Sequence, residues 1–262
     1  MLNDMTLRLE KLGINAEEVL TSLTFTVEPY TVFLSGSIIE GYGNVDSDLD
    51  VFVIYPEQIP SLEADFSVGN TLINMEYTTN WRMDVESWTR EQVELVAQHL
   101  SQHSASNWNQ SLRVSIDELN FAHRIRIGVP VLHPEHFQQL QQAFNFEYVS
   151  RIIMNRNLIW YTGVQEDAAG AIASKQYGTA LLMGREAVQL AIDILIASQG
   201  ETNTKAKWRF FKLEKLGDPA LLERYWELET PTISTKDDVL KYAKECIIFA
   251  SQLVLKVQKA KG

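Results

Sequence analysis

Apolar and polar residues follow a strand-like pattern in the first half of the chain. Runs of β-branched and aromatic residues predict strands over 31–34 and 48–54. Residues 71–78 alternate between polar and apolar positions, which predicts a third strand. Helical spacing and stop signals then predict the remaining elements of this half, over 4–20, 84–99, 112–127 and a short last strand over 129–132. In this prediction Asp84 is the N-cap of the second helix.

From about residue 147 onward the strand pattern disappears and helical spacing replaces it. Helices are predicted over 147–173, 177–199, 204–216, 219–228 and 236–256. The last of them carries a regular apolar stripe that includes Cys246. We therefore predict an α/β fold in which a small mixed sheet with helices (residues 1–145) is followed by an all-helical bundle domain (residues 146–262).

Two acidic residues open the second predicted strand. Asp48 and Asp50 are two positions apart, so they share one face of that strand. Two carboxylates about 4 Å apart repel by roughly 4 kcal/mol at an effective dielectric near 20, so a cation between them is expected. Glu76, on the more polar face of the third predicted strand, would complete three oxygen ligands suited to Mg²⁺ or Mn²⁺. The alternative is a solvated edge strand whose acids oppose aggregation.

A glycine and a serine follow the first predicted strand. Gly36 would let backbone amides approach a phosphate closely. The segment from Ser37 to Glu40 also has the pattern of a helix capping box, which needs no ligand. The two interpretations are compatible, because Ser37 can cap a helix and still face a phosphate.

Gly36-Ser37, a spacer of ten residues, and Asp48-Leu49-Asp50 together resemble the signature of the DNA polymerase β-like nucleotidyltransferase superfamily. The surrounding sequence resembles stand-alone bacterial members, including the aminoglycoside and lincosamide nucleotidyltransferases. Ser35 departs from this pattern, because that position is usually hydrophobic. The motif spans residues 31–78, under a third of the chain, so the resemblance bears on the reaction more than on the acceptor.

The resemblance implies a two-metal transfer of a nucleoside monophosphate, most simply AMP from ATP, to a hydroxyl group. Asp48, Asp50 and Glu76 would bind two Mg²⁺ ions, with Mn²⁺ as the alternative, and Glu76 would also take the proton of the attacking hydroxyl. The residues implied to contact the ATP or another NTP are Gly36, Ser37, Ser47 and Lys207. The expected acceptor is a small molecule. A tRNA or protein acceptor remains an alternative, as does a non-catalytic protein that binds a nucleotide or a partner.

Lys207 lies in the densest basic run of the chain, residues 205–215. By the resemblance, the helical half would supply this lysine to the triphosphate. The alternative is a solvated helix face in which Trp208 and Phe211 are buried.

Two further groups of residues leave alternatives open. His133 and His136 could form a metal pair, but the intervening proline spoils helical spacing and histidine is a poor ligand for Mg²⁺, which favours a turn. Arg124 and Arg126 would either line the substrate cleft or close the C-terminus of a helix.

The composition of the chain indicates which classes of partner it binds and in which compartment it is located. The formal net charge of −11 argues against sequence-independent binding to long nucleic acids and favours a small, cationic acceptor. No apolar run approaches the roughly 20 residues of a membrane span. The single cysteine fits a reducing compartment, so a cytoplasmic location is expected. The apolar helical half could bury a homodimer interface.

Overall fold

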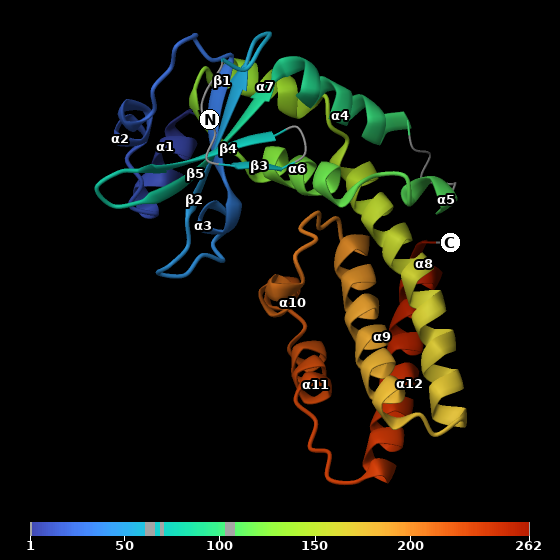
Figure 1. Ribbon diagram of the computed structural model, residues 1–262. Helices are drawn as coiled ribbons and strands as arrows, with labels where there is room; N and C mark the ends of the chain where they lie inside the picture. Colours follow the sequence, from blue (N-terminus) through green and yellow to red (C-terminus); the bar gives the residue numbers. More distant parts are fainter. Residues whose placement is uncertain (1, 61–65, 69–70, 103–107, 262) are drawn as a thin grey trace. The chain divides into compact units, whose positions relative to one another are not determined.

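The computed structural model describes residues 2–60, 66–68, 71–102 and 108–261 (Figure 1). By its contacts the chain divides into two compact units. The first comprises Met1–Gln102 and Asn120–Asn145, and the second comprises His103–Leu119 and Phe146–Gly262.

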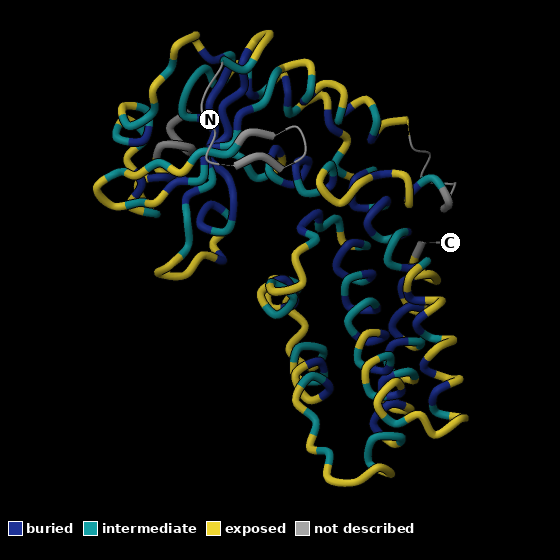
Figure 2. Tube along the Cα trace, in the orientation of Figure 1, coloured by how far each residue is buried: buried dark blue, intermediate teal, exposed yellow. Residues whose placement is uncertain are grey.

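A six-stranded mixed sheet forms the centre of the first unit, with the strand order β3-β4-β5-β2-β1-β6. The strands are β1 (Thr31–Ser35), β2 (Leu49–Tyr55), β3 (Phe66–Val68), β4 (Thr71–Tyr77), β5 (Arg82–Thr89) and β6 (Val129–Leu132). β2 and β5 pair in parallel, and the other neighbours pair antiparallel. β1 and β2 are buried along almost their whole length (Figure 2). The apolar run that follows Asp50 therefore belongs to a central strand rather than to an edge.

Helices cover both faces of this sheet. On one face, α1 (Leu2–Lys11) and α2 (Ala16–Ser22) share an apolar cluster with strand residues such as Leu34, Val51 and Met83. On the other face, Phe121 of α6 (Ile116–Ile127) and Phe137 of α7 (Pro134–Gln142) pack against aromatic residues of the strands. The remaining helices of this half are α3 (Gly36–Glu40), α4 (Arg90–Gln102) and α5 (Trp108–Ser111).

The predicted helix over 84–99 is wrong in its first six residues, which belong to β5. Met83, Val85 and Ser87 are buried and alternate with less buried neighbours, which is the two-residue period of a strand. β2 pairs along one side of β5 and β4 along the other, so pairing within the sheet overrides the local helical signal. Asp84 is thus a residue of a central strand and not a helix cap.

Two other predicted helices begin or end elsewhere. The helix expected over 4–20 is two helices, because Gly13 has a φ of +71° and Asn15 then caps α2 by accepting from the Glu17 and Glu18 amides. The helix expected from residue 112 begins at Ile116, where Ser115 and Glu118 form a reciprocal capping box.

The second unit is built from three long helices, α8 (Phe146–Ala173), α9 (Tyr177–Ser198) and α12 (Lys236–Lys261). Shorter elements connect α9 to α12, namely η1 (Ala206–Trp208), α10 (Arg209–Leu216) and α11 (Pro219–Glu229). Cys246 is fully buried among them, as predicted, and burial raises the pKa of its thiol to about 11. The predicted fold class, a mixed sheet with helices followed by a helical region, is confirmed. Among the described residues, no helix is both long enough and apolar enough to cross a membrane.

Candidate active site

The turn between β1 and α3 brings the chain backbone directly against the Asp50 carboxylate. Gly36 opens this turn with a φ of +85°, a conformation that side-chain-bearing residues rarely adopt. A Cβ atom at this position would lie 1.6 Å from Asp50 Oδ2 and 2.8 Å from Arg124 Nη1. Glycine is therefore required both by the backbone angle and by the close approach of Asp50.

The predicted capping box from Ser37 to Glu40 is wrong. α3 begins at Gly36, and Ser35 occupies its N-cap without a capping hydrogen bond from its side chain. Ser35 Oγ instead donates to the Arg124 carbonyl oxygen at 2.9 Å. The Glu40 carboxylate lies 3.4 Å from His123 Nε2, and both side chains are buried. Ser37 is thus not committed to a cap, and Ser35 ties the strand end to α6.

Asp50 and Asp84 lie side by side on adjacent strands. They are register partners in the parallel pairing of β2 and β5, so their side chains share one face of the sheet. Asp48 immediately precedes β2, two residues before Asp50. Burial raises the pKa of Asp84, the negative charge of Asp48 raises it further, and Arg82 opposes the rise. Asp48 and Asp84 are therefore coupled electrostatically, and Asp50 joins this group of acids through its strand register with Asp84.

A fourth acid extends this group along β5. Burial raises the pKa of Glu86, and the charges of Asp50 and Asp84 add to the rise. The positive charge of Arg124 and a hydrogen bond from the Trp88 indole act in the other direction and lower the pKa of Glu86.

Two arginines from different elements hold the acids. Arg124 on α6 forks onto Asp50, with Nη2 3.1 Å from Oδ1 and Nη1 3.4 Å from Oδ2. Arg82 at the start of β5 pairs with Asp48, and this pairing raises the pKa of the guanidinium. Arg124 lies in the last turn of α6 and its guanidinium pairs with Asp50.

Glu76 is not brought together with these acids. Its register partner on β5 is Met83, which neighbours Leu49 in turn, so Glu76 points to the face covered by α1 and α2. Asp84, rather than Glu76, is the acid that lies beside Asp50. In the sequence Asp84 resembles a helix cap, although the alternation of Met83 and Val85 with polar residues indicates a strand.

Ser47 lies next to Asp48 in a tight loop. The Asn44 amide donates to Ser47 Oγ at 2.9 Å, and Ser47 Oγ lies 3.1 Å from Asn44 Oδ1. Ser47 therefore shapes the approach of the chain to Asp48.

Lys207 belongs to the second unit, not to the unit that carries the acids. Its ammonium group lies over the Trp208 ring, 4.7 Å from the ring centroid. The expected solvated face is wrong in detail, because Lys212 is buried and donates to the Asn203 carbonyl oxygen, whereas Phe211 is exposed.

The acids have the donor chemistry that a magnesium site requires. Carboxylate oxygens are the ligands that Mg²⁺ prefers, and the missing Cβ of Gly36 lets the Asp50 carboxylate lie directly against the turn. In the described part of the chain, however, these carboxylates are not one of the tight clusters in which a ligand atom of every member lies within 4.8 Å of the others. The pairs with Arg82 and Arg124 would have to loosen when an ion binds.

Comparison with models of known protein families gives no match. Comparison with curated proteins also gives no match. Among solved structures, the chain is similar to a nucleotidyltransferase-like protein from Exiguobacterium sibiricum 255-15, with 12% identity and a TM-score of 0.46 over 88% of this chain and 70% of that chain. A likeness this distant does not assign a function to the chain.

Proposed function

We propose that this chain is a nucleotidyltransferase that moves a nucleoside monophosphate, most simply AMP from ATP, to a hydroxyl group of a small molecule. One observation carries the proposal. Asp48, Asp50 and Asp84 gather on one face of two central strands, beside a glycine turn against which Asp50 lies directly. The sequence resemblance implies the same combination of a Gly-Ser turn, two acids on one strand and a third acid on another.

Asp48, Asp50 and Asp84 would hold Mg²⁺, or Mn²⁺ through the same oxygen donors. When bound, the ions supply positive charge that stabilises the attacking and leaving oxygens of an in-line displacement. In this proposal Asp84 replaces Glu76 as the third carboxylate, because Asp84 is the acid that shares a face with Asp50.

The chain's own groups position the reactants. Arg124 orients Asp50 through a hydrogen bond and an ion pair, and Arg82 orients Asp48 through an ion pair. The Gly36-Ser37 turn would receive the phosphates, since it follows directly on the strand end that lies against Asp50. The net charge of −11 favours a cationic acceptor, which the field of the protein would attract.

The test is incubation with each NTP, labelled at the α-phosphate, together with Mg²⁺ and a cell extract. We expect label from ATP to appear on a small molecule. Label on RNA or on protein would leave the reaction intact and replace the acceptor. Failure of every NTP to transfer label would contradict the proposal.

Two matched variants test which carboxylate is the third one. Asp84→Asn should reduce transfer by about 100-fold or more, because a ligand of the charge-stabilising site is lost. Glu76→Gln, on the other face of the same sheet, should retain activity close to that of the wild type. Loss of transfer in Glu76→Gln alone would make Glu76 the third carboxylate. Transfer close to that of the wild type in both variants would place the site elsewhere.

A second candidate is a protein that binds a nucleotide without turnover. The pairs of Arg82 with Asp48 and of Arg124 with Asp50 favour it, because they compensate the acids without a metal. Nucleotide binding without any transfer of label would support this candidate over the first.

A further inference from the structure

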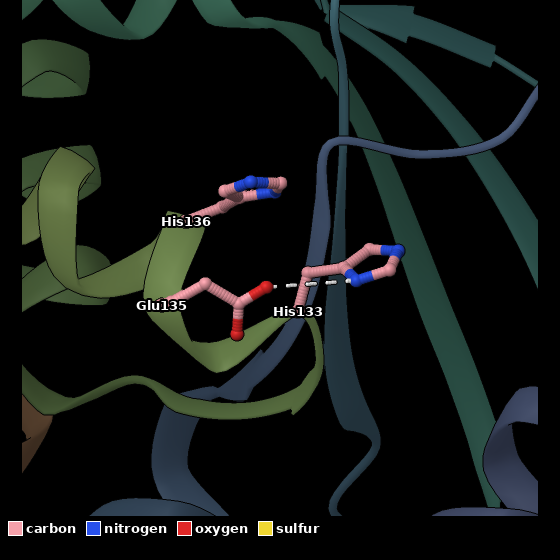
Figure 3. Close-up of side chains that lie close together, drawn as sticks. All are labelled: His133, Glu135 and His136. Carbon is pink, nitrogen blue, oxygen red and sulfur yellow. Dashed lines mark ion pairs between the residues drawn. The ribbon is translucent and has the colours of Figure 1, made fainter.

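Two histidines and a glutamate come together where β6 ends and α7 begins (Figure 3). One ligand atom from each of His133, Glu135 and His136 lies within 4.8 Å of the other two. His133 Nδ1 lies 3.8 Å from Glu135 Oε1, the contact drawn as a dashed line. The proline between the histidines does not separate them, because α7 begins at Pro134 and His133 precedes the helix.

The backbone at His133 adopts an uncommon conformation to make this arrangement. Its φ of 48° and ψ of 62° lie in the left-handed region, which is unfavourable for a residue with a side chain. The side chain makes no capping hydrogen bond to α7 in return. Buried Thr31 on β1 holds the turn, since its hydroxyl donates to the Leu132 carbonyl oxygen at 2.7 Å. Such strain on a rigid support is typical of functional positions.

The hydrogen bonds of the two rings determine which nitrogen of each could bind a metal. His136 Nδ1 lies 2.8 Å from the Tyr30 carbonyl oxygen, which can only accept, so Nδ1 carries the proton and Nε2 keeps its lone pair. The ring also stacks on Tyr30, with centroids 4.2 Å apart. His133 Nε2 lies 3.0 Å from the Glu28 carboxylate, which assigns the proton to Nε2 and the lone pair to Nδ1.

This pattern is the one that metal-ligating histidines show. In such sites one ring nitrogen binds the ion and the other donates to a carbonyl or a carboxylate, which fixes the tautomer and the ring orientation. Here His136 has the carbonyl of Tyr30 and His133 has the carboxylate of Glu28. The lone pair of His133 faces the Glu135 carboxylate, which supplies the third donor.

We propose that His133 Nδ1, His136 Nε2 and the Glu135 carboxylate form a binding site for Zn²⁺, with water in the fourth position. Two imidazoles and one carboxylate suit Zn²⁺, whereas Mg²⁺ prefers oxygen ligands alone. Ligands about 2.0 Å from a tetrahedral ion are about 3.3 Å apart, so the 3.8 Å contact needs only a small contraction. The exposed Glu135 side chain has room to make this contraction. This site is separate from the acids of β2 and β5 and does not depend on the proposed transfer reaction.

The full chain, stripped of metal with a chelator, is titrated with Zn²⁺ in competition with a chromophoric chelator. We expect one Zn²⁺ to bind per chain and the unfolding temperature to rise when it does. His133→Ala and His136→Ala should abolish this binding. His99→Ala, which changes a histidine on α4, should leave it unchanged. Zn²⁺ affinity that is equal in all of these variants would overturn the proposal.

Two further measurements cover the case in which a histidine variant fails to fold. Glu28→Gln should weaken Zn²⁺ binding by roughly 10- to 100-fold, because Glu28 orients His133 without ligating the ion. In the unaltered chain, Zn²⁺ should shift the NMR signals of the His133 and His136 rings and leave those of His99 and His123 in place. Unchanged ring signals at His133 and His136 would contradict the site. Asp50→Asn should keep Zn²⁺ binding. Loss of Zn²⁺ binding in this variant would assign the ion to the acids of β2 and β5 instead.

Discussion

At the scale of single residues, the candidate active site depends on close contacts that are only partly predictable from the sequence. The Gly-Ser turn and the pair Asp48 and Asp50 are readable, because their spacing follows from the geometry of one strand. The partners of these acids are not readable, because Asp84, Arg82 and Arg124 reach them through strand register and helix packing. Local sequence patterns carry no information on such long-range contacts.

Gly36 should be far less tolerant of a side chain than a glycine with the same backbone angle. Gly41 has a φ of +84° and open space around its Cβ position, whereas a Cβ at Gly36 would collide with Asp50. Gly41→Ala should destabilise the protein by about 1 kcal/mol, from the backbone angle alone. Gly36→Ala should cost more and should also displace Asp50 and abolish transfer. Denaturant unfolding and the label-transfer assay measure the two effects, and equal stability of the two variants would contradict the close approach.

Glu86 should make stability depend on pH. Its pKa in the folded protein is raised above the ordinary value of about 4.5, chiefly by burial, so the folded state holds its proton more tightly than the unfolded state. The stability that this proton provides is present below about pH 4.5 and is lost as the pH rises through the raised pKa. Glu86→Gln should therefore gain stability relative to the wild type at neutral pH and gain less, or lose, in acid. Unfolding temperatures across this range test it, and a difference independent of pH would refute it.

At the scale of elements, prediction from the sequence was wrong where a strand signal and a helix signal occurred in the same segment. Residues 82–89 alternate like a strand, yet Asp84 resembles a helix cap and a helical pattern follows it. Pairing with β2 and β4 decides in favour of the strand. The same competition affects caps, since a Ser-x-x-Glu pattern occurs at Ser37 and at Ser115, and only Ser115 forms the capping box.

The two serines give a direct comparison of capping. Ser115→Ala should destabilise the protein by about 1 kcal/mol, because the Glu118 amide at the start of α6 loses its acceptor. Ser37→Ala should cost much less, since that side chain caps nothing at α3. Thermal unfolding of both variants provides the measurement. A larger loss of stability from Ser37→Ala than from Ser115→Ala would contradict the start of α3 at Gly36.

At the scale of the whole molecule, the division of the sequence into strand-forming and helix-forming halves corresponds to real differences in periodicity. The long helices α8, α9 and α12 were predictable because amphipathic spacing is sustained over many turns. The sheet order was not, because nothing local specifies that β5 lies between β4 and β2. The identity of the acceptor was not predictable either, since no sequence motif in the helical half indicates which molecule this half would bind.

Arg124 is attached to the ends of two neighbouring strands at once. Its carbonyl oxygen accepts from Ser35 on β1, while its guanidinium holds Asp50 on β2. In terms of hydrogen exchange, the turn at Gly36 therefore cannot open as an independent surface loop, because its opening requires α6 to release both strands. Amide protons in this turn should exchange with the slow protons of the sheet core, although the turn follows the end of a strand.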